Sequence, residues 1–199
     1  MGITEKFNHL KRIISDPNFL SGKVLCNDLP IFIADYDITE EDEFIKMENN
    51  LIKTLETMGI KVLSIDLYNL VIEILQKDRG DWDWVMSSDR NKEELLEELK
   101  GILGVEDKVI PAVADKMAQN EGNYDVLFLT GCGNIFPYLR THTILNNLHT
   151  HIKKPVIVFF PGVSVSKGSP YAAFNLFGRI DEGNDYRAAN IFQIRRLES

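Results

Sequence analysis

The sequence predicts one α/β domain of three layers, with a mainly parallel sheet of about five strands and helices on both faces. Two short runs, residues 126–129 and 156–160, are continuously apolar, as in strands that are buried on both faces. A helix-length segment joins them, which indicates a βαβ unit with a right-handed crossover. Earlier in the chain, strand and helix patterns alternate in the same way, which is typical of a parallel sheet. No repeat or low-complexity linker divides the 199 residues, so we expect a single domain.

The first 23 residues predict an N-terminal helix that packs on the sheet. Apolar side chains recur there at helical spacing, and Pro17 marks the end of the pattern. The apolar run at residues 30–34 is the first predicted strand. It is followed by Asp35, Tyr36 and Asp37.

A second helix and strand come next. Thr39 and Asp42 have the spacing of a capping box, and the apolar stripe that follows them ends at Gly59. Residues 61–65 are the second predicted strand. Asp66 is placed to cap the helix after it.

Residues 78–120 form a helical insertion before the third strand. Their first part is rich in Asp and Ser, and two helical patterns follow. Trp82 and Trp84 lie two positions apart in this insertion. Two interpretations remain open: the rings cover the base of the insertion, or they form a partner surface, where Trp is enriched. The chain closes with an edge strand predicted at residues 186–194.

Charge and composition restrict the function. The net charge is −8, and residues 1–149 carry 26 acidic and 15 basic side chains, whereas residues 150–199 are net positive. Because an acidic body repels a phosphate backbone, we expect no direct nucleic-acid binding. No apolar run has the length of a membrane helix, and no signal-peptide pattern opens the chain. Cys26 and Cys132 lack CxxC spacing, so we expect two thiols in a cytoplasmic protein.

The segment TGCGNIFPYLR follows the third strand, at residues 130–140. Open parallel sheets meet ligands and partners at the carboxyl ends of their strands, so this loop and residues 161–167 are the first place to look for a site. Gly131 and Gly133 permit a sharp turn, and Pro137 suits the first turn of a helix. A helix start beside Arg140 could hold an anion. The alternative is a tight turn that binds nothing.

The motifs disfavour nucleotides and zinc. GxGxxG fails because Phe136 occupies its third glycine position, and GxxxxGK[ST] occurs nowhere in the chain. Zinc needs three or four converging ligands, and no close pair anchors such a set. The residues that could suggest one, which are better interpreted as core-edge side chains, are His142, His149, His151 and Cys132.

Three carboxylates end the first two strands. We expect these neighbouring strand ends to bring Asp35, Asp37 and Asp66 together, where they could bind magnesium or act as acid and base. They could equally cap helices. A serine nucleophile would need an elbow such as GxSxG, which the chain lacks. We therefore expect neither catalysis nor a metal or cofactor.

With these motifs in order, nearly the whole chain resembles the BrxB family, the small protein of BREX phage-exclusion systems. The segments that carry the resemblance are PIFIADYD, KVLSIDLYNLVIEIL, LTGCGNIFPYLRTHTILNNL, PVIVFFPG, LFGRI and YRAANIF. The third is the most specific, because its succession of Gly, Pro, Arg, His and Asn is hard to obtain by chance. The insertion at residues 78–120 is the least specific part.

The resemblance implies a non-catalytic, cytoplasmic defence protein that acts beside a DNA methyltransferase, a large ATPase and the alkaline-phosphatase-like protein PglZ. PglZ is the leading candidate for direct contact, and no catalytic residues are implied. The family motif maps onto a candidate interaction edge formed by Tyr36, Asp37, Gly131, Gly133, Asn134, Pro137, Arg140 and His142.

Arg140 has two expected roles at that edge. It could brace the loop by pairing with Asp37 from the neighbouring strand end, or it could pair with a carboxylate on a partner. By fold analogy alone, the order of elements also resembles a P-loop NTPase core without its phosphate loop. That analogy leaves a degenerate nucleotide-binding protein, and more weakly a metal-dependent hydrolase, as alternatives.

Overall fold

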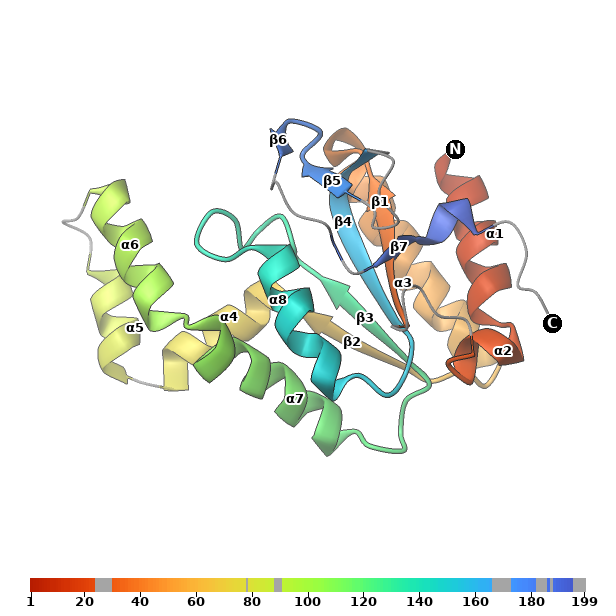
Figure 1. Ribbon diagram of the computed structural model, residues 1–199, viewed down its shortest axis with the longest axis horizontal. Coiled ribbons are helices and arrows are strands. Elements are labelled where there is room, and N and C mark those ends of the chain that lie inside the picture. The colour runs from red at the N-terminus through yellow and green to blue at the C-terminus, as the bar shows by residue number, and fades with distance from the viewer. Residues whose placement is uncertain are drawn as a thin grey trace.

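A parallel sheet forms the centre of the molecule (Figure 1). The computed structural model describes residues 1–23, 30–77, 79–87, 91–165, 173–181, 186 and 188–194, so Cys26 lies outside the described residues. The strands lie in the order β2-β3-β4-β1-β7, and every neighbouring pair is parallel. Their bounds are Val62–Asp66 for β2, Val126–Thr130 for β3, Val156–Val165 for β4, Ile31–Tyr36 for β1 and Ala189–Asn190 for β7. The predicted parallel α/β sheet is confirmed.

The end of β4 carries an antiparallel extension that the sequence did not predict. β4 continues through Pro161 to Val165 and pairs with β5 (Ala173–Leu176), which pairs in turn with β6 (Ile180–Asp181). Gly162 is needed there, because a Cβ atom would collide with the Asn175 carbonyl oxygen and the Phe160 ring. The expectation of a loop from residue 161 was therefore wrong for residues 161–165. Residues 166–167 are not described.

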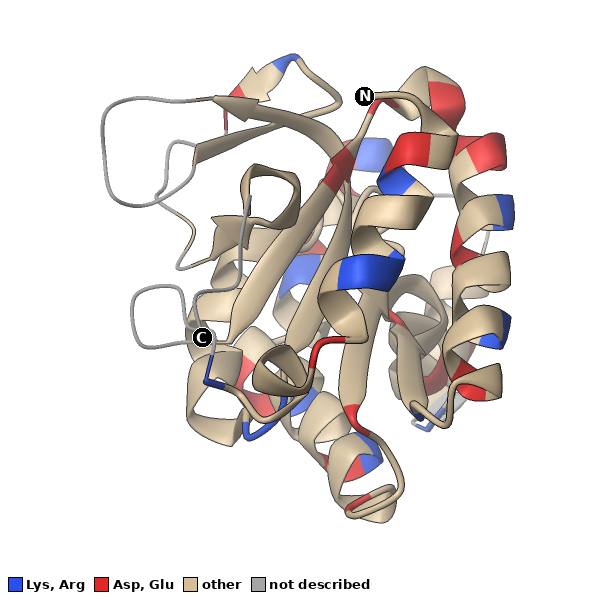
Figure 2. Cartoon of the chain, turned by 90° about the vertical axis from the view of Figure 1, so that its right-hand side faces the viewer, with Lys and Arg blue, Asp and Glu red and all other residues tan. Residues whose placement is uncertain are grey.

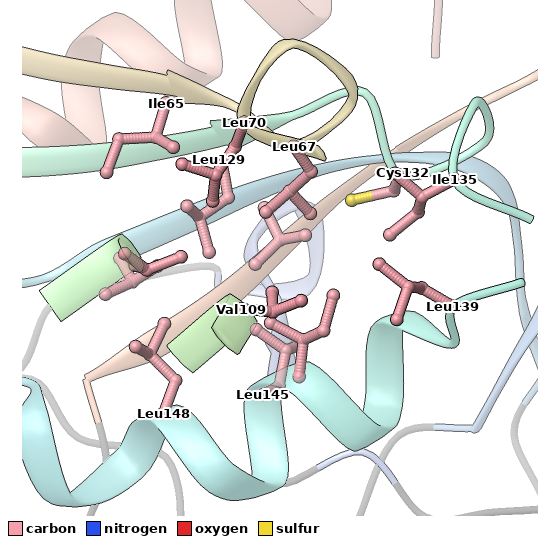
Figure 3. Close-up of a cluster of buried hydrophobic side chains, with 14 of the residues drawn as sticks. Ile65, Leu67, Leu70, Val109, Leu129, Cys132, Ile135, Leu139, Leu145 and Leu148 are labelled. Carbon is pink, nitrogen blue, oxygen red and sulfur yellow. The ribbon is translucent and has the colours of Figure 1, made fainter. Parts of the chain in front are cut away.

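Helices cover both faces of the sheet. The helices α1 (Ile3–Ile14), α2 (Pro17–Leu20) and α3 (Glu41–Thr57) pack on one face, and α4 (Leu67–Lys77), α7 (Ile110–Gln119) and α8 (Thr141–Leu148) on the other. The alternation of side chains along each strand separates two cores. In β3, Val126 and Phe128 face α1 and α3, whereas Leu127 and Leu129 face α4, α7 and α8. Figure 3 shows part of the second core.

The predicted insertion is helical and projects from the sheet (Figure 1). It contains α5 (Arg79–Met86), α6 (Lys92–Ile102) and a π-helical turn, η2 (Val105–Val109), that leads into α7. No residue of α6 is fully buried, whereas Leu103 and Val109 beyond it reach the core. Among the described helices, none has the length and apolarity to cross a membrane.

Three short 3-10 turns complete the fold. They are η1 (Ile38–Glu40), η3 (His149–His151) and η4 (Ile191–Gln193). The last one shortens the predicted final strand. Only Ala189 and Asn190 pair with β1 as β7, and Asn190 then caps η4 by accepting from the Phe192 N–H at 2.9 Å. The edge position of this strand is confirmed, but its predicted length was wrong.

Candidate functional site

The lateral order of the strands separates the carboxylates that were expected to cluster. β3 and β4 lie between β1 and β2, so Asp66 is three strand spacings, roughly 14 Å, away from the end of β1. The expectation that Asp35, Asp37 and Asp66 meet was therefore wrong. Within the residues that the structure describes, no group of three or more His, Cys, Asp or Glu side chains could hold a metal ion.

Each of the three carboxylates has a structural contact instead. Asp35 accepts from Asn190 Nδ2 at 2.9 Å and from the Ser164 N–H at 3.1 Å, which ties β1 to β7 and β4. Asp37 caps η1 by accepting from the Thr39 N–H and hydroxyl, and these hydrogen bonds lower the pKa of its carboxyl group. Asp66 caps α4 as predicted, accepting from the Asn69 N–H at 2.7 Å.

The turn after β1 stands where a phosphate loop would follow the first strand of a P-loop protein. Here that position is strongly acidic, as the red segments at this end of α3 show in Figure 2. The residues are Asp37, Glu40, Glu41, Asp42 and Glu43. They favour the start of α3 through the helix dipole but would repel a phosphate group.

Two positions of the central loop require glycine, because neighbouring residues lie too close to leave room for a side chain. Gly131 has φ +73°, and a Cβ atom on it would lie 3.0 Å from Asp66 Oδ2. A Cβ atom on Gly133 would lie 2.9 Å from Pro161 Cγ and 3.0 Å from Phe177 Cε1. The loop therefore runs tightly against the end of β2 on one side and against the β4–β5 extension on the other.

The helix after the loop begins later than expected. α8 starts at Thr141, with Arg140 as its N-cap residue, and the Phe136–Pro137 peptide bond is cis. The predicted helix start at Pro137 was wrong. As a result, Arg140 belongs to the end of the loop rather than to the first helical turn. Its guanidinium carbon lies 4.9 Å from the centre of the Phe136 ring.

The predicted brace between Arg140 and Asp37 rested on the assumption that their strand ends are neighbours. That assumption was wrong, because β4 separates β1 from β3. The Asp37 carboxylate instead accepts hydrogen bonds from the Thr39 N–H and hydroxyl.

The central loop is anchored to the core by its buried side chains, and other side chains of the loop are exposed to solvent. Cys132, Ile135 and Leu139 point into the core under it (Figure 3), each almost fully buried. Asn134 and Pro137 stand exposed between these anchors. The loop therefore presents a surface with little freedom to rearrange, which lowers the entropic cost of binding.

Aromatic residues of this loop were not singled out from the sequence. Phe136 packs edge-on against Phe177, with ring centres 6.2 Å apart, and both are partly buried. The Tyr138 hydroxyl donates to the Asn134 carbonyl oxygen at 2.9 Å, and burial raises the pKa of Tyr138 to about 12. The available signal in the sequence was the pair of aromatic residues on either side of Pro137.

The remaining predicted residues take mainly structural positions. Tyr36 is buried, stacks on Phe44 with ring centres 4.1 Å apart, and donates to Glu41 Oε1 at 3.4 Å. His142 lies edge-on to Tyr186, with ring centres 6.0 Å apart.

Trp82 is half-buried and packs against the core under α4 and α7, whereas Trp84 is half-buried on α5 without being part of that core. The two interpretations of Trp84 stay open.

The fold and the residues at the carboxyl edge of the sheet together define a class of protein. The sheet is an open parallel α/β sheet whose first turn carries carboxylates in place of a phosphate loop. At its carboxyl edge, it displays a pinned loop with aromatic rings and an arginine. These features define an open parallel α/β domain without a phosphate loop.

Sequence comparison identifies the family. The model of the BrxB family, described as BREX protein BrxB, matches residues 63–191. A BREX protein BrxB of Bacillus cereus (strain H3081.97) is 30% identical over 197 residues, covering 94% of this chain and 95% of that protein. One of Escherichia coli O9:H4 (strain HS) is 26% identical over 188 residues, covering 92% and 88%. The chain belongs to the BrxB family. No solved structure matches it.

The match locates the candidate residues within the family. The matched region begins in β2 and includes the whole central loop, so Gly131, Asn134 and Arg140 lie inside it. Tyr36 and Asp37 lie outside it, on β1 and just after it.

Proposed function

We propose that this chain is a non-catalytic component of a BREX phage-defence system that acts by binding PglZ, the alkaline-phosphatase-like protein of such systems. The observation that carries the proposal is the loop at residues 131–140, which is anchored by three buried side chains and displays Phe136, Tyr138 and Arg140. Aromatic and arginine side chains supply most hot spots of protein interfaces. Membership in the BrxB family supports a role in a BREX system.

A binding role is favoured over a catalytic one by the contacts of the carboxylates. The side chains that could serve a hydrolase at this edge, Asp35, Asp37 and Asp66, are engaged in caps and strand ties, and Asp66 lies three strands away from the other two. A general acid or base must instead be able to reach a substrate proton. The acidic turn after β1 likewise disfavours a nucleotide.

The test is co-purification of the tagged chain from cells that carry the whole defence cluster. We expect PglZ to be retained by the parent chain. Asn134→Glu should weaken that retention about tenfold or more, because it adds a long, negatively charged side chain to an exposed point of the loop without touching the core.

Asn49→Glu is the matched control, since Asn49 is also exposed but lies on α3, over the opposite face of the sheet. Absence of PglZ from the parent eluate would contradict the assigned partner. Retention of PglZ by both variants would show that the loop is not the contact surface.

A further inference from the structure

A pocket of about 400 Å³ lies where the helical insertion meets the central loop. The insertion contributes Leu96 and Lys100 from α6 and Leu103 and Val105 after it. The other wall is formed by Pro137, Tyr138, Leu139, Arg140 and Thr143. The insertion and the loop therefore build one site, although they are more than 30 residues apart in sequence.

The inner part of the pocket is apolar. Leu103 and Leu139 are almost fully buried beneath it, and Leu96 and Val105 are half-buried at its side. A cavity of this size with such a lining accommodates one or two large apolar side chains. Filling it would remove apolar surface from water at about 25 cal/mol per Å².

The rim of the pocket is positively charged, which is unusual in this acidic chain. Lys100 and Arg140 line it, and no Asp or Glu side chain does so among the described residues. The three other pockets described for this molecule each include at least one carboxylate: Asp115 and Glu121, Glu43, and Asp107 and Asp115, respectively. The whole chain has a net charge of −8, so a rim lined by basic and not by acidic side chains is a local exception that favours an anion.

Lys100 can be recruited at small cost. Its ammonium group lies 2.7 Å from Glu97 Oε1, one turn earlier on α6, and both side chains are largely exposed. An exposed ion pair of this kind contributes little to stability. A carboxylate of a partner could therefore replace Glu97 as the counter-ion of Lys100.

We propose that this pocket is an anchor site for an acidic and apolar segment of the partner protein, with an apolar side chain in the pocket and a carboxylate at Lys100. This inference rests on the proposed partner-binding function and specifies how that binding is achieved. A protein segment is favoured over a small anion because one wall is α6, a helix without a fully buried residue, whereas small-molecule sites enclose most of their ligand. The pocket is also continuous with the central loop, because Pro137 and Arg140 of that loop line it.

The experiment measures retention of the BREX proteins by the tagged full-length chain, with the unfolding temperature of each variant measured in parallel. Lys100→Glu reverses the charge of an exposed rim residue, and Thr143→Phe fills the pocket from α8. We expect each to weaken retention of the partner at least tenfold and to leave the unfolding temperature within a few degrees of the parent. Lys92→Glu is the matched control, because it makes the same charge change on the same helix outside the pocket; we expect parental retention.

Each other outcome overturns the inference in a recognisable way. If the parent retains its partner and Lys100→Glu and Thr143→Phe retain it equally, the anchor site is wrong while the binding function stands. If no BREX protein is retained by the parent chain, the proposed function fails and the anchor site fails with it. If Lys92→Glu weakens retention as much as Lys100→Glu does, the effect is one of overall charge and not of the pocket. If Lys100→Glu instead lowers the unfolding temperature strongly, Lys100 stabilises the fold and its assignment as a partner contact is wrong.

Discussion

Gly131 and Asp66 lie in contact across the ends of β3 and β2. A Cβ atom at position 131 would be 3.0 Å from Asp66 Oδ2 and 3.1 Å from Oδ1. The same carboxylate caps α4 at Asn69 and accepts from the Thr130 hydroxyl at 3.2 Å. The start of the central loop and the cap of α4 are therefore one structural unit, and only a residue without a side chain fits between them.

The first prediction tests this contact. Gly131→Ala should lower the free energy of unfolding by about 1–3 kcal/mol for the left-handed backbone alone, and by more because the Asp66 carboxylate must move. Gly59→Ala is the control, since Gly59 has φ +80° with nothing within 4 Å of the added Cβ. Urea unfolding of both variants measures the difference. Equal losses would show that the contact with Asp66 adds nothing.

The second prediction concerns pH. Burial, and secondarily the Asp66 carboxylate, raises the pKa of Glu48 from 4.5 to about 7. The folded protein therefore binds this proton more tightly than the unfolded chain, and the stabilisation is complete below about pH 4.5 and lost as the pH rises through 7. Glu48→Gln should leave stability near its parental value at pH 4.5 and raise it by about 1–3 kcal/mol at pH 8. Thermal unfolding at both pH values measures this.

Glu56→Gln is the control for that experiment, because Glu56 is exposed on the same helix. It should leave the difference between the two pH values unchanged. A Glu48→Gln variant with the parental pH profile would show that Glu48 is ionised without cost in the folded protein.

The elements of the fold were predictable because burial on both faces leaves continuous apolar runs in β3 and β4. Their lateral order was not, since a pattern identifies strands without saying which lie side by side. The expected cluster of Asp35 and Asp66 failed for that reason alone. The β5–β6 hairpin was missed because the Pro, Gly and Ser residues at the end of β4 are typical of a loop.

The predicted residues of the candidate edge lie at the carboxyl ends of β1 and β3, but the loop that follows β3 was described incompletely. Gly131 and Gly133 were predictable from the turn that they permit. The start of α8 was not, because Pro137 is common in a first helical turn, yet here Ile135 and Leu139 must both reach the core before the helix begins. Phe136 and Tyr138 were passed over because an aromatic residue in a sequence is usually a core residue, whereas in the structure both are only partly buried where they pack against the core.

The third prediction is that the purified protein neither binds nor hydrolyses ATP. The turn after β1 has five acidic residues within seven positions, from Asp37 to Glu43, and no P-loop lysine. Repulsion of the phosphates should outweigh the attraction of the α3 helix dipole, which is worth about 1 kcal/mol or less. Calorimetry with ATP and magnesium measures binding. A dissociation constant in the micromolar range would contradict the prediction and restore the degenerate nucleotide-binding protein as the better hypothesis.

The fourth prediction concerns Arg140, which contacts the Phe136 ring and lines the pocket beside the insertion. Arg140→Ala removes a cation–π contact worth about 0.5–1 kcal/mol and one of the two positive charges of the rim. If Arg140 serves the partner, the unfolding temperature should fall by only a few degrees while retention of PglZ weakens about tenfold or more. If Arg140 is chiefly an internal brace, the loss of stability should approach 3 kcal/mol, as expected when a hydrogen-bonded charge is removed.

Arg12→Ala is the control, because Arg12 is exposed on α1 over the other face of the sheet. Thermal unfolding and co-purification measured together separate the two roles, and parental values in both would remove Arg140 from the site.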